Sequence, residues 1–299
     1  MSDAPFIAVF TKNRTNPAYA AARLGADRTA QRMGARTVHY VPQKPDDADE
    51  QIALIDTALA ARPAACVLVP VHPTAVNAAI RKINAAGVPI VGFINRFTEP
   101  KSIVSLVTSE DYPLALAIAT YLCGNLKGRG DVVIVEGPRE SVTSLERVRG
   151  FRDAVKKFPA MRVAATVCGE YQHDETVRAG KEFMKSQPRF DAVLAANDVM
   201  ALAMLEVFDA AGRASVVVGI NAVPDAITAI KRGKLLATVD FDAMKMGCLA
   251  TEAAIRHLRG EKVPAEIILP VQVVDTNNCA LWDKSFEERG CPRWEDIVQ

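Results

Sequence analysis

The alternation of short apolar runs with amphipathic stretches is the feature that most constrains the fold of this chain. The runs are rich in Val, Ile, Ala and Phe, recur between residues 6 and 274, and are mostly separated by segments with helical spacing. Such alternation is typical of mostly parallel sheets covered by helices, so we predict an α/β protein. The expected strands are Phe6–Phe10, Thr37–Val41, Ala65–Val69, a run within Gly87–Arg96, Ile103–Val107, Val132–Val135, Met161–Val167, Ala192–Ala195, Ser215–Ile220, Leu235–Val239 and Ile267–Val274.

The alternation breaks once, and the break indicates two lobes. The strand at Ile103–Val107 follows the preceding strand with no helix between them, which we interpret as the first passage out of one lobe. A chain of 299 residues is long enough for two cores. We assign residues 1–107 and 242–268 to an N-terminal lobe, and residues 108–241 and 269–299 to a C-terminal lobe. The tail from Asp275 onward has no clear period and is expected to lie on a lobe surface.

The charge balance argues against nucleic acid and membrane partners. Lys and Arg number 36 and Asp and Glu number 35, a net charge of +1 with no basic run. No apolar stretch approaches the roughly 20 residues that span a bilayer. Residues 1–5 lack the charged leader and apolar segment of an export signal, which leaves open a cytosolic protein or one whose signal was removed.

The cysteines fall into two groups. Four lie within or beside apolar runs and are expected to be small buried side chains: Cys66, Cys123, Cys168 and Cys248. Cys279 and Cys291 lie in the polar tail, where they could form a disulfide or remain as two free thiols, because spacing does not determine pairing.

Motifs for catalysis and for metal or cofactor binding are missing from the sequence. It contains no phosphate-binding Gly-x-x-x-x-Gly-Lys-Ser/Thr run, no Gly-x-Gly-x-x-Gly, no Gly-x-Ser-x-Gly and no His-Glu-x-x-His. The cysteine and histidine spacings do not match a metal site. We therefore predict no catalytic residue, no metal and no cofactor. A small hydrolase or isomerase is the weakest of our hypotheses and would require product formation to support it.

Polar side chains instead recur at or near the ends of the expected strands. Ligands of open α/β sheets bind outside the carboxyl ends of the strands. Amides and guanidinium groups can satisfy the hydroxyl groups of a ligand, which favours binding without turnover. Several of these residues also have simpler roles, as helix caps (Asn95, Asn221, Asp198) or ion-pair partners (Arg96 with Glu99). The set is Asn16, Asn95, Arg96, Arg147, Asn197, Asp198 and Asn221.

Six segments, in this order, resemble ribose-binding-type periplasmic proteins, the type I solute-binding proteins of ABC sugar importers. The resemblance covers roughly residues 6–275 and implies two Rossmann-like lobes joined by three crossovers, with the ligand between them. The segments are Asn16-Pro17-Ala18-Tyr19, Val88-Pro89-Ile90 leading to Asn95-Arg96, Arg147-Val148-Arg149-Gly150-Phe151, Ala196-Asn197-Asp198-Val199-Met200-Ala201, Val218-Gly219-Ile220-Asn221 and Gly233-Lys234-Leu235-Leu236-Ala237-Thr238.

The resemblance also implies which residues contact the ligand. Tyr19 and Phe241 could instead pack in the core, and Lys12 and His173 could be solvated loop residues. The implied contacts are Lys12, Asn16, Tyr19, Asn95, Arg96, Arg147, Tyr171, His173, Asn197, Asn221 and Phe241.

Four positions depart from the family pattern. Asn95 and Asn221 replace usual Asp residues, Ala18 replaces an aromatic residue, and Phe241 replaces a common Gln. The loss of two carboxylates argues against ribose and allows an acidic ligand such as a sugar acid.

The resemblance implies a periplasmic, monomeric, non-enzymatic protein. It would deliver a sugar, polyol or sugar acid to an ABC permease, with a chemoreceptor as a second candidate partner. The alternative is the ligand-sensing domain of a lactose-repressor-like regulator or of a chemoreceptor-linked sensor, which share this fold. A repressor would carry a DNA-binding helix-turn-helix before the first strand.

Overall fold

The computed structural model describes residues 4–186 and 189–298, which divide into two compact units. Unit 1 comprises the described parts of Met1–Glu110, Asp242–Pro270 and Phe286–Gln299, and unit 2 comprises Asp111–Phe241 and Val271–Ser285. The chain thus passes between the units after residues 110, 241, 270 and 285. The sequence interpretation placed three passages, after residues 107, 241 and 268, and assigned the whole tail to the second lobe. In the structure the tail is divided, because residues from Phe286 onward pack with unit 1.

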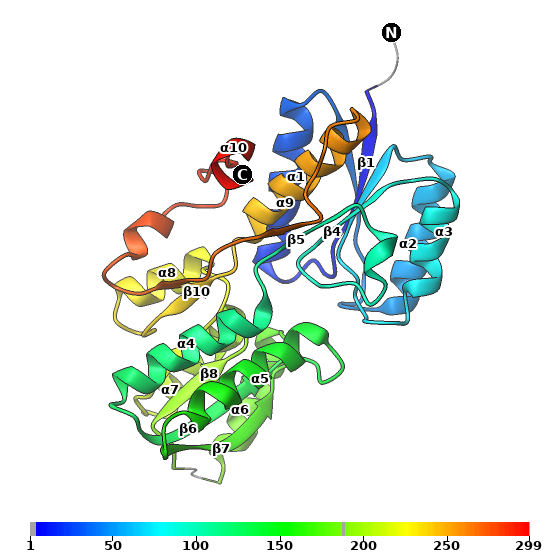
Figure 1. Ribbon diagram of the computed structural model, residues 1–299. Coiled ribbons are helices and arrows are strands. Elements are labelled where there is room, and N and C mark those ends of the chain that lie inside the picture. Colours follow the sequence, from blue (N-terminus) through cyan, green and yellow to red (C-terminus); the bar gives the residue numbers. More distant parts are fainter. Residues whose placement is uncertain (1–3, 187–188, 299) are drawn as a thin grey trace. The chain divides into compact units, whose positions relative to one another are not determined.

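Unit 1 is built on a six-stranded sheet of order β11-β5-β4-β3-β1-β2, in which every pair is parallel. Its elements are β1 (Phe6–Phe10), α1 (Pro17–Arg32), β2 (Arg36–Tyr40), α2 (Ala48–Ala60), β3 (Ala65–Leu68), α3 (Asn77–Ala85), β4 (Ile90–Phe93), η1 (Pro100–Ser102), β5 (Ser105–Thr108), α9 (Ala243–Leu258), β11 (Glu266–Ile268) and α10 (Trp294–Ile297). The strand order reverses direction after β2, so right-handed connections place α1 on one face and α2 and α3 on the other (Figure 1). Helix α9 packs beside α1.

Unit 2 is built on a four-stranded parallel sheet of order β7-β6-β8-β9 and an antiparallel pair, β10 and β12. Its elements are α4 (Asp111–Asn125), β6 (Arg129–Glu136), α5 (Val142–Lys156), β7 (Ala160–Cys168), α6 (His173–Met184), β8 (Ala192–Ala195), α7 (Asp198–Ala210), β9 (Val216–Val218), α8 (Pro224–Lys231), β10 (Thr238–Asp240), β12 (Gln272–Val274) and η2 (Cys279–Trp282). Helix α4 packs against α5, and α6 packs against α7. The strand order reverses after β7, which creates a switch point between β6 and β8 where ligands of such sheets bind.

The apolar runs are continuous because their strands are covered on both faces. Every residue of β1, β3, β4 and β5 is buried. On the other side of the unit 1 sheet from α2 and α3, α1 and α9 approach closely at Gly25 and Gly247, where a Cβ would meet backbone atoms of the facing helix. Within the described residues, no helix is both long enough and apolar enough to cross a membrane.

The last expected strand, Ile267–Val274, is two strands in the structure. Strand β11 joins β5 in unit 1, and β12 pairs with β10 in unit 2. Pro270 lies between them and has no backbone N–H to continue a ladder. The proline therefore explains why one apolar run serves two sheets.

The disulfide pairing differs from both alternatives left open by the sequence. Cys291 pairs with Cys248 of α9, with their Cα atoms 6.0 Å apart, whereas Cys279 is a buried free thiol. The expectation that Cys248 is only a buried apolar side chain is therefore wrong. Phe286 and Cys291 pack with Ala21, Met244 and Cys248, so the link attaches the end of the tail to α1 and α9.

Candidate ligand-binding site

Arg147 is the centre of a buried polar cluster in unit 2. Its side chain, from α5, is 3% exposed and donates from Nε to Asp111 Oδ1 at 2.8 Å. It also donates from one terminal nitrogen to Ala196 O at 2.6 Å and to Asn221 Oδ1 at 3.4 Å. The sequence predicts Arg147 and Asn221 as contacts, and the structure brings them together. Asp111, the first residue of α4, is a partner that the sequence analysis missed.

Phe241 lies against the same guanidinium group. It follows β10 directly, is 4% exposed, and its ring centroid is 4.9 Å from the Arg147 guanidinium carbon. A cation over an aromatic face is attracted by the ring quadrupole. Phe241 is therefore packed within the Arg147 cluster, in line with the packing alternative, and its contact with a ligand stays a prediction.

Two buried side-chain amides at this cluster each have an Nδ2 donor that is not hydrogen-bonded within the described residues. Asn197 caps α7 by accepting from Met200 N at 2.8 Å and is fully buried. Asn221 is 5% exposed and follows β9 with a φ of 128°. Among the described residues, neither Nδ2 has a hydrogen-bond partner. A buried donor left unpaired costs about 1–3 kcal/mol, so each amide favours an incoming acceptor.

Asp198 lies behind these amides and is also fully buried. Its two carboxylate oxygens accept from Thr238 Oγ1 at 2.7 Å and from Val223 N at 3.0 Å. Burial away from water raises the pKa of Asp198 to about 6, partly offset by these hydrogen bonds and by the charge of Arg147. Asp198 thus supports the loop that carries Asn221, and the cap of α7 is Asn197 rather than Asp198.

The raised pKa of Asp198 predicts a pH-dependent stability. Between about pH 4 and pH 6 the folded state keeps a proton that the unfolded state has lost, so the free energy of unfolding falls as pH rises through this window. Above pH 6 the loss is complete and amounts to about 2–3 kcal/mol. We expect Asp198→Asn to remove this pH dependence. Urea unfolding should then show that the free energy of unfolding of the variant rises relative to that of the wild type between pH 4 and pH 7. A constant difference across this range would contradict the assignment.

His173 is the first residue of α6, and Tyr171 lies two positions before it. The Tyr171 ring packs against Gly137, which follows β6, and leaves no space for a Cβ there. The His173 side chain is 49% exposed and bonds to Asp174 and Glu206 at 2.9 and 3.0 Å, and these carboxylates raise its pKa. The structure therefore places His173 in an exposed ion-pair cluster, in line with the solvated-loop alternative.

In unit 1 the loop after β1 holds Lys12 and Asn16. Lys12 is 3% exposed and pairs with Asp46 at 3.3 Å, so it is not a solvated loop residue. Asn16 caps α1 by accepting from Ala18 N at 3.0 Å. Asn13, which the sequence analysis missed, links them by donating to Asp46 at 3.2 Å and accepting from Asn16 N at 3.0 Å. Tyr19, one helical position beyond Ala18, is 8% exposed.

Asn95 and Arg96 follow β4, which β3 separates from β1, at the same edge of the sheet. Asn95 is 4% exposed. The Arg96 side chain is 49% exposed and bonds to Glu110 and Glu266 at 2.5 and 2.7 Å, which hold its pKa above the ordinary value. The alternative partner Glu99 instead pairs with Arg81. Arg96 is therefore an exposed ion-pair residue in this structure, and not part of the buried polar set.

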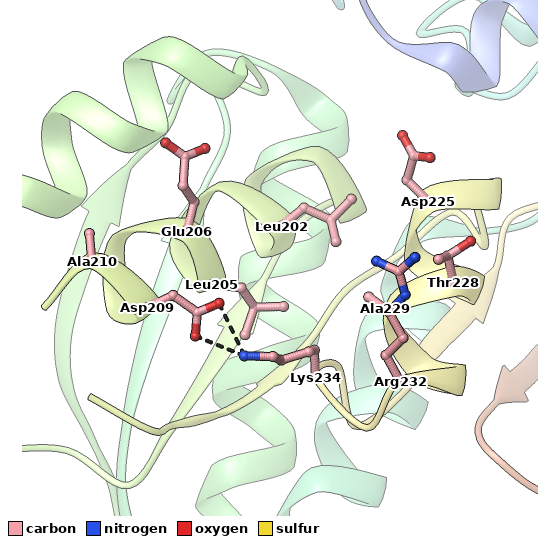
Figure 2. A pocket seen from close by; sticks show the side chains of 10 residues that line it. All are labelled: Leu202, Leu205, Glu206, Asp209, Ala210, Asp225, Thr228, Ala229, Arg232 and Lys234. Carbon is pink, nitrogen blue, oxygen red and sulfur yellow. Dashed lines mark hydrogen bonds and ion pairs between the residues drawn. The ribbon is translucent and has the colours of Figure 1, made fainter. Parts of the chain in front are cut away.

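A separate groove lies between α7 and α8 on unit 2 (Figure 2). Its volume is about 610 Å³, and at its rim Lys234 bonds to Asp209 at 3.0 Å. The predicted contacts lie elsewhere in the described part of the chain. The lining residues are Leu202, Leu205, Glu206, Asp209, Ala210, Asp225, Thr228, Ala229, Arg232 and Lys234.

Metal ligation finds no support in the described ranges, 4–186 and 189–298. They contain no group of three or more His, Cys, Asp or Glu side chains that could hold a metal ion. The buried candidate residues described above mainly contribute amides and cations that are paired with carboxylates. This chemistry suits hydrogen bonding to an uncharged polar molecule.

Comparison with known proteins gives relatives of similar length. The chain is 27% identical over 258 residues to a ribose import binding protein of Bacillus subtilis, covering 86% of this chain and 83% of the relative. It is 29% identical over 257 residues to a D-apiose import binding protein of Paraburkholderia graminis, with coverages of 86% and 82%. A solute-binding protein of an ABC transporter from Bacillus halodurans, solved with bound myo-inositol, superposes with a TM-score of 0.88 at 23% identity, covering 95% and 98% of the two chains.

These comparisons confirm the predicted fold class, an α/β protein with two mostly parallel sheets. They also confirm the resemblance stated from the six segments. The family described as periplasmic binding protein domain matches residues 7–262. Because this match spans most of the sequence, the chain belongs to the periplasmic binding protein domain family, whose members bind solutes and are not enzymes.

Proposed function

We propose that this protein captures a neutral sugar or polyol and presents it to the permease of an ABC importer. The observation that carries the proposal is the pair of buried Nδ2 groups on Asn197 and Asn221, which lack partners among the described residues and lie beside the Arg147 cluster. Hydroxyl oxygens are acceptors that would satisfy them. The relatives named for ribose and D-apiose import, and the fold relative with bound myo-inositol, support this class of ligand.

The charges favour a neutral ligand over the sugar acid that the sequence allowed. The buried cations Lys12 and Arg147 already have carboxylate partners, Asp46 at 3.3 Å and Asp111 at 2.8 Å. A ligand carboxylate is therefore not needed to neutralise either of these two buried cations. Burying an extra, unmatched carboxylate would instead carry a desolvation cost.

The site in unit 1 is proposed to consist of Lys12, Asn16, Tyr19 and Asn95, and the site in unit 2 of Arg147, Asn197, Asn221 and Phe241. Tyr171 is kept as a candidate because its ring lies at Gly137, beside the end of β6. Arg96 and His173 are weaker candidates, because both are half exposed and paired with carboxylates. The proposed location is the periplasm, in keeping with the family.

Calorimetry with ribose, D-apiose, xylitol, myo-inositol and D-allose, each beside the related sugar acid where one exists, tests the proposal. We expect at least one neutral compound to bind and its acidic counterpart to bind more weakly. Stronger binding of the acid would reject the neutral class. If none of these compounds gave a calorimetric binding signal, the proposed function would be rejected.

Asn197→Ser tests the buried amide directly. Serine is as good a helix cap as asparagine, so α7 keeps its acceptor for Met200 N, whereas the Nδ2 donor is lost. We expect the ligand affinity measured by calorimetry to fall about 10- to 100-fold, the value of one to two net hydrogen bonds. The matched control is Asp47→Ser at the cap of α2, which accepts from Glu50 N at 3.0 Å. An equal loss of affinity in both variants would contradict a direct role for Asn197.

A further inference from the structure

Residues 275–285 of the tail form a compact turn that is fastened to unit 2 at several points. Tyr121 of α4 donates to Asp275 Oδ2 at 2.7 Å, and Asn278 donates to Val273 O at 2.9 Å. Lys231 of α8 pairs with Asp283 at 2.5 Å. These bonds hold η2, and with it Trp282, against the region of α8 and β10.

Trp282 reaches from this turn to the strand that precedes Phe241. Its side chain donates from Nε1 to Asp240 Oδ2 at 2.8 Å, and the two residues are 9% and 8% exposed. Asp240 is the last residue of β10, a strand of three residues that pairs with β12 and whose Val239 O also accepts from Asn221 N at 2.9 Å. The Trp282 bond adds a side-chain contact at the last residue of this strand, where the chain turns toward Phe241.

The next residue along the chain is Phe241, whose ring lies 4.9 Å from the Arg147 guanidinium carbon. We infer that Trp282 is a positioning residue for the ligand site: by holding the Asp240 carboxylate, it fixes the exit of β10 and thereby the ring of Phe241 beneath Arg147. The inference rests on the proposed function, since Phe241 and Arg147 are proposed ligand contacts. It assigns to the tail a role that neither the six family-like segments nor the polar strand ends indicate.

The chain contains only two tryptophans, which makes the inference accessible to fluorescence. Trp282 lies on Asp240, one residue from Phe241, whereas Trp294 lies in unit 1 beside Arg256, with 4.9 Å between the guanidinium carbon and the ring centroid. In Trp294→Phe the emission comes from Trp282, and in Trp282→Phe it comes from Trp294. Indole emission responds to changes in nearby charge and polarity, so each variant reports on one place.

The experiment combines calorimetry and emission spectra, using the neutral ligand found for the wild type. We expect Trp294→Phe to bind like the wild type and to change its emission on binding. We expect Trp282→Phe to show no emission change and to bind roughly tenfold more weakly, the effect of one lost hydrogen bond to a charged group. Asp240→Asn, which keeps an acceptor for Nε1, should recover most of the affinity that an Asp240→Ala variant loses.

The inference would be overturned if Trp282→Phe bound the ligand with wild-type affinity and the emission of Trp294→Phe did not change on binding. The proposed function would remain intact. If Trp282→Phe does not fold, two other measurements test the inference. An emission of Trp294→Phe that does not change on ligand binding would overturn it. Equal ligand affinities of Asp240→Asn and Asp240→Ala would also overturn it. The absence of any wild-type response in calorimetry would instead count against the proposed function.

Discussion

Arg147→Met is expected to weaken ligand binding at least 100-fold and to lower the free energy of unfolding by about 3–5 kcal/mol. The substitution removes the donor shared by Asp111, Ala196 and Asn221, and it leaves the Asp111 carboxylate, 6% exposed, without its buried counter-charge. Removing one member of a buried ion pair costs this much, because the remaining charge is desolvated and uncompensated. Calorimetry measures the first effect and urea unfolding the second.

Two controls separate binding from stability for Arg147. The double variant Asp111→Asn with Arg147→Met contains no orphaned carboxylate, so it should recover much of the stability but none of the binding. Arg149→Met changes a half-exposed arginine on the same helix, which pairs with Glu146, and should alter neither property much. Normal binding by the double variant would show that Arg147 does not contact the ligand.

Gly247→Ala is expected to destabilise unit 1 by about 3 kcal/mol or more. A Cβ at this position of α9 would come far inside the contact distance of Ala22 O on α1, and the backbone of a packed helix cannot move aside as a flexible side chain can. The reciprocal contact exists at Gly25, whose Cβ would meet Met244 O. Overpacking in well-packed cores costs about 1–3 kcal/mol and more where the neighbour is fixed. Urea unfolding followed by circular dichroism measures the loss.

Gly124→Ala is the matched control for this helix contact. Gly124 also lies within a helix, α4, but an added Cβ would meet nothing within 4 Å. Alanine is the better helix former, so we expect a gain of about 0.5–1 kcal/mol. If both alanine variants changed the stability in the same direction, helix propensity rather than the α1–α9 contact would govern Gly247.

The fold was predictable because its strands are covered on both faces. Continuous apolar runs such as those ending at Phe10 and Leu68 mark strands whatever their neighbours are. The hydrophobic pattern alone was misleading at Ile267–Val274, which is mostly apolar and was predicted as one strand, because Pro270 divides it between two units. The sequence also did not predict that the tail is divided between the two units. The tail is attached through the disulfide between Cys248 and Cys291 and through the bond of Trp282 to Asp240, both of which join residues far apart in the sequence.

The strand-end argument identified only part of the candidate site, since Arg147 lies within α5. Asn197 and Asn221 follow β8 and β9, and the structure places them next to the groups that bond to Arg147. Asp111 and Asp46 could not be identified, because nothing in the local sequence indicates which carboxylate a buried cation meets after folding. The sequence also did not indicate which groups Arg96 would meet. Its guanidinium group was expected to contact the ligand, but it pairs with Glu110 and Glu266, which are distant in the sequence.

Lys12 pairs with Asp46 and Arg147 pairs with Asp111, and both cations are buried. This burial affects how ligand affinity should depend on salt concentration. Dissolved salt weakens attractions between exposed charges over about 10 Å at 0.1 M, but it affects buried pairs far less. A neutral solute would enter without displacing counter-ions, so its affinity would depend on hydrogen bonds and shape alone. The proposed binding of a neutral solute would then change little between low and high salt concentration.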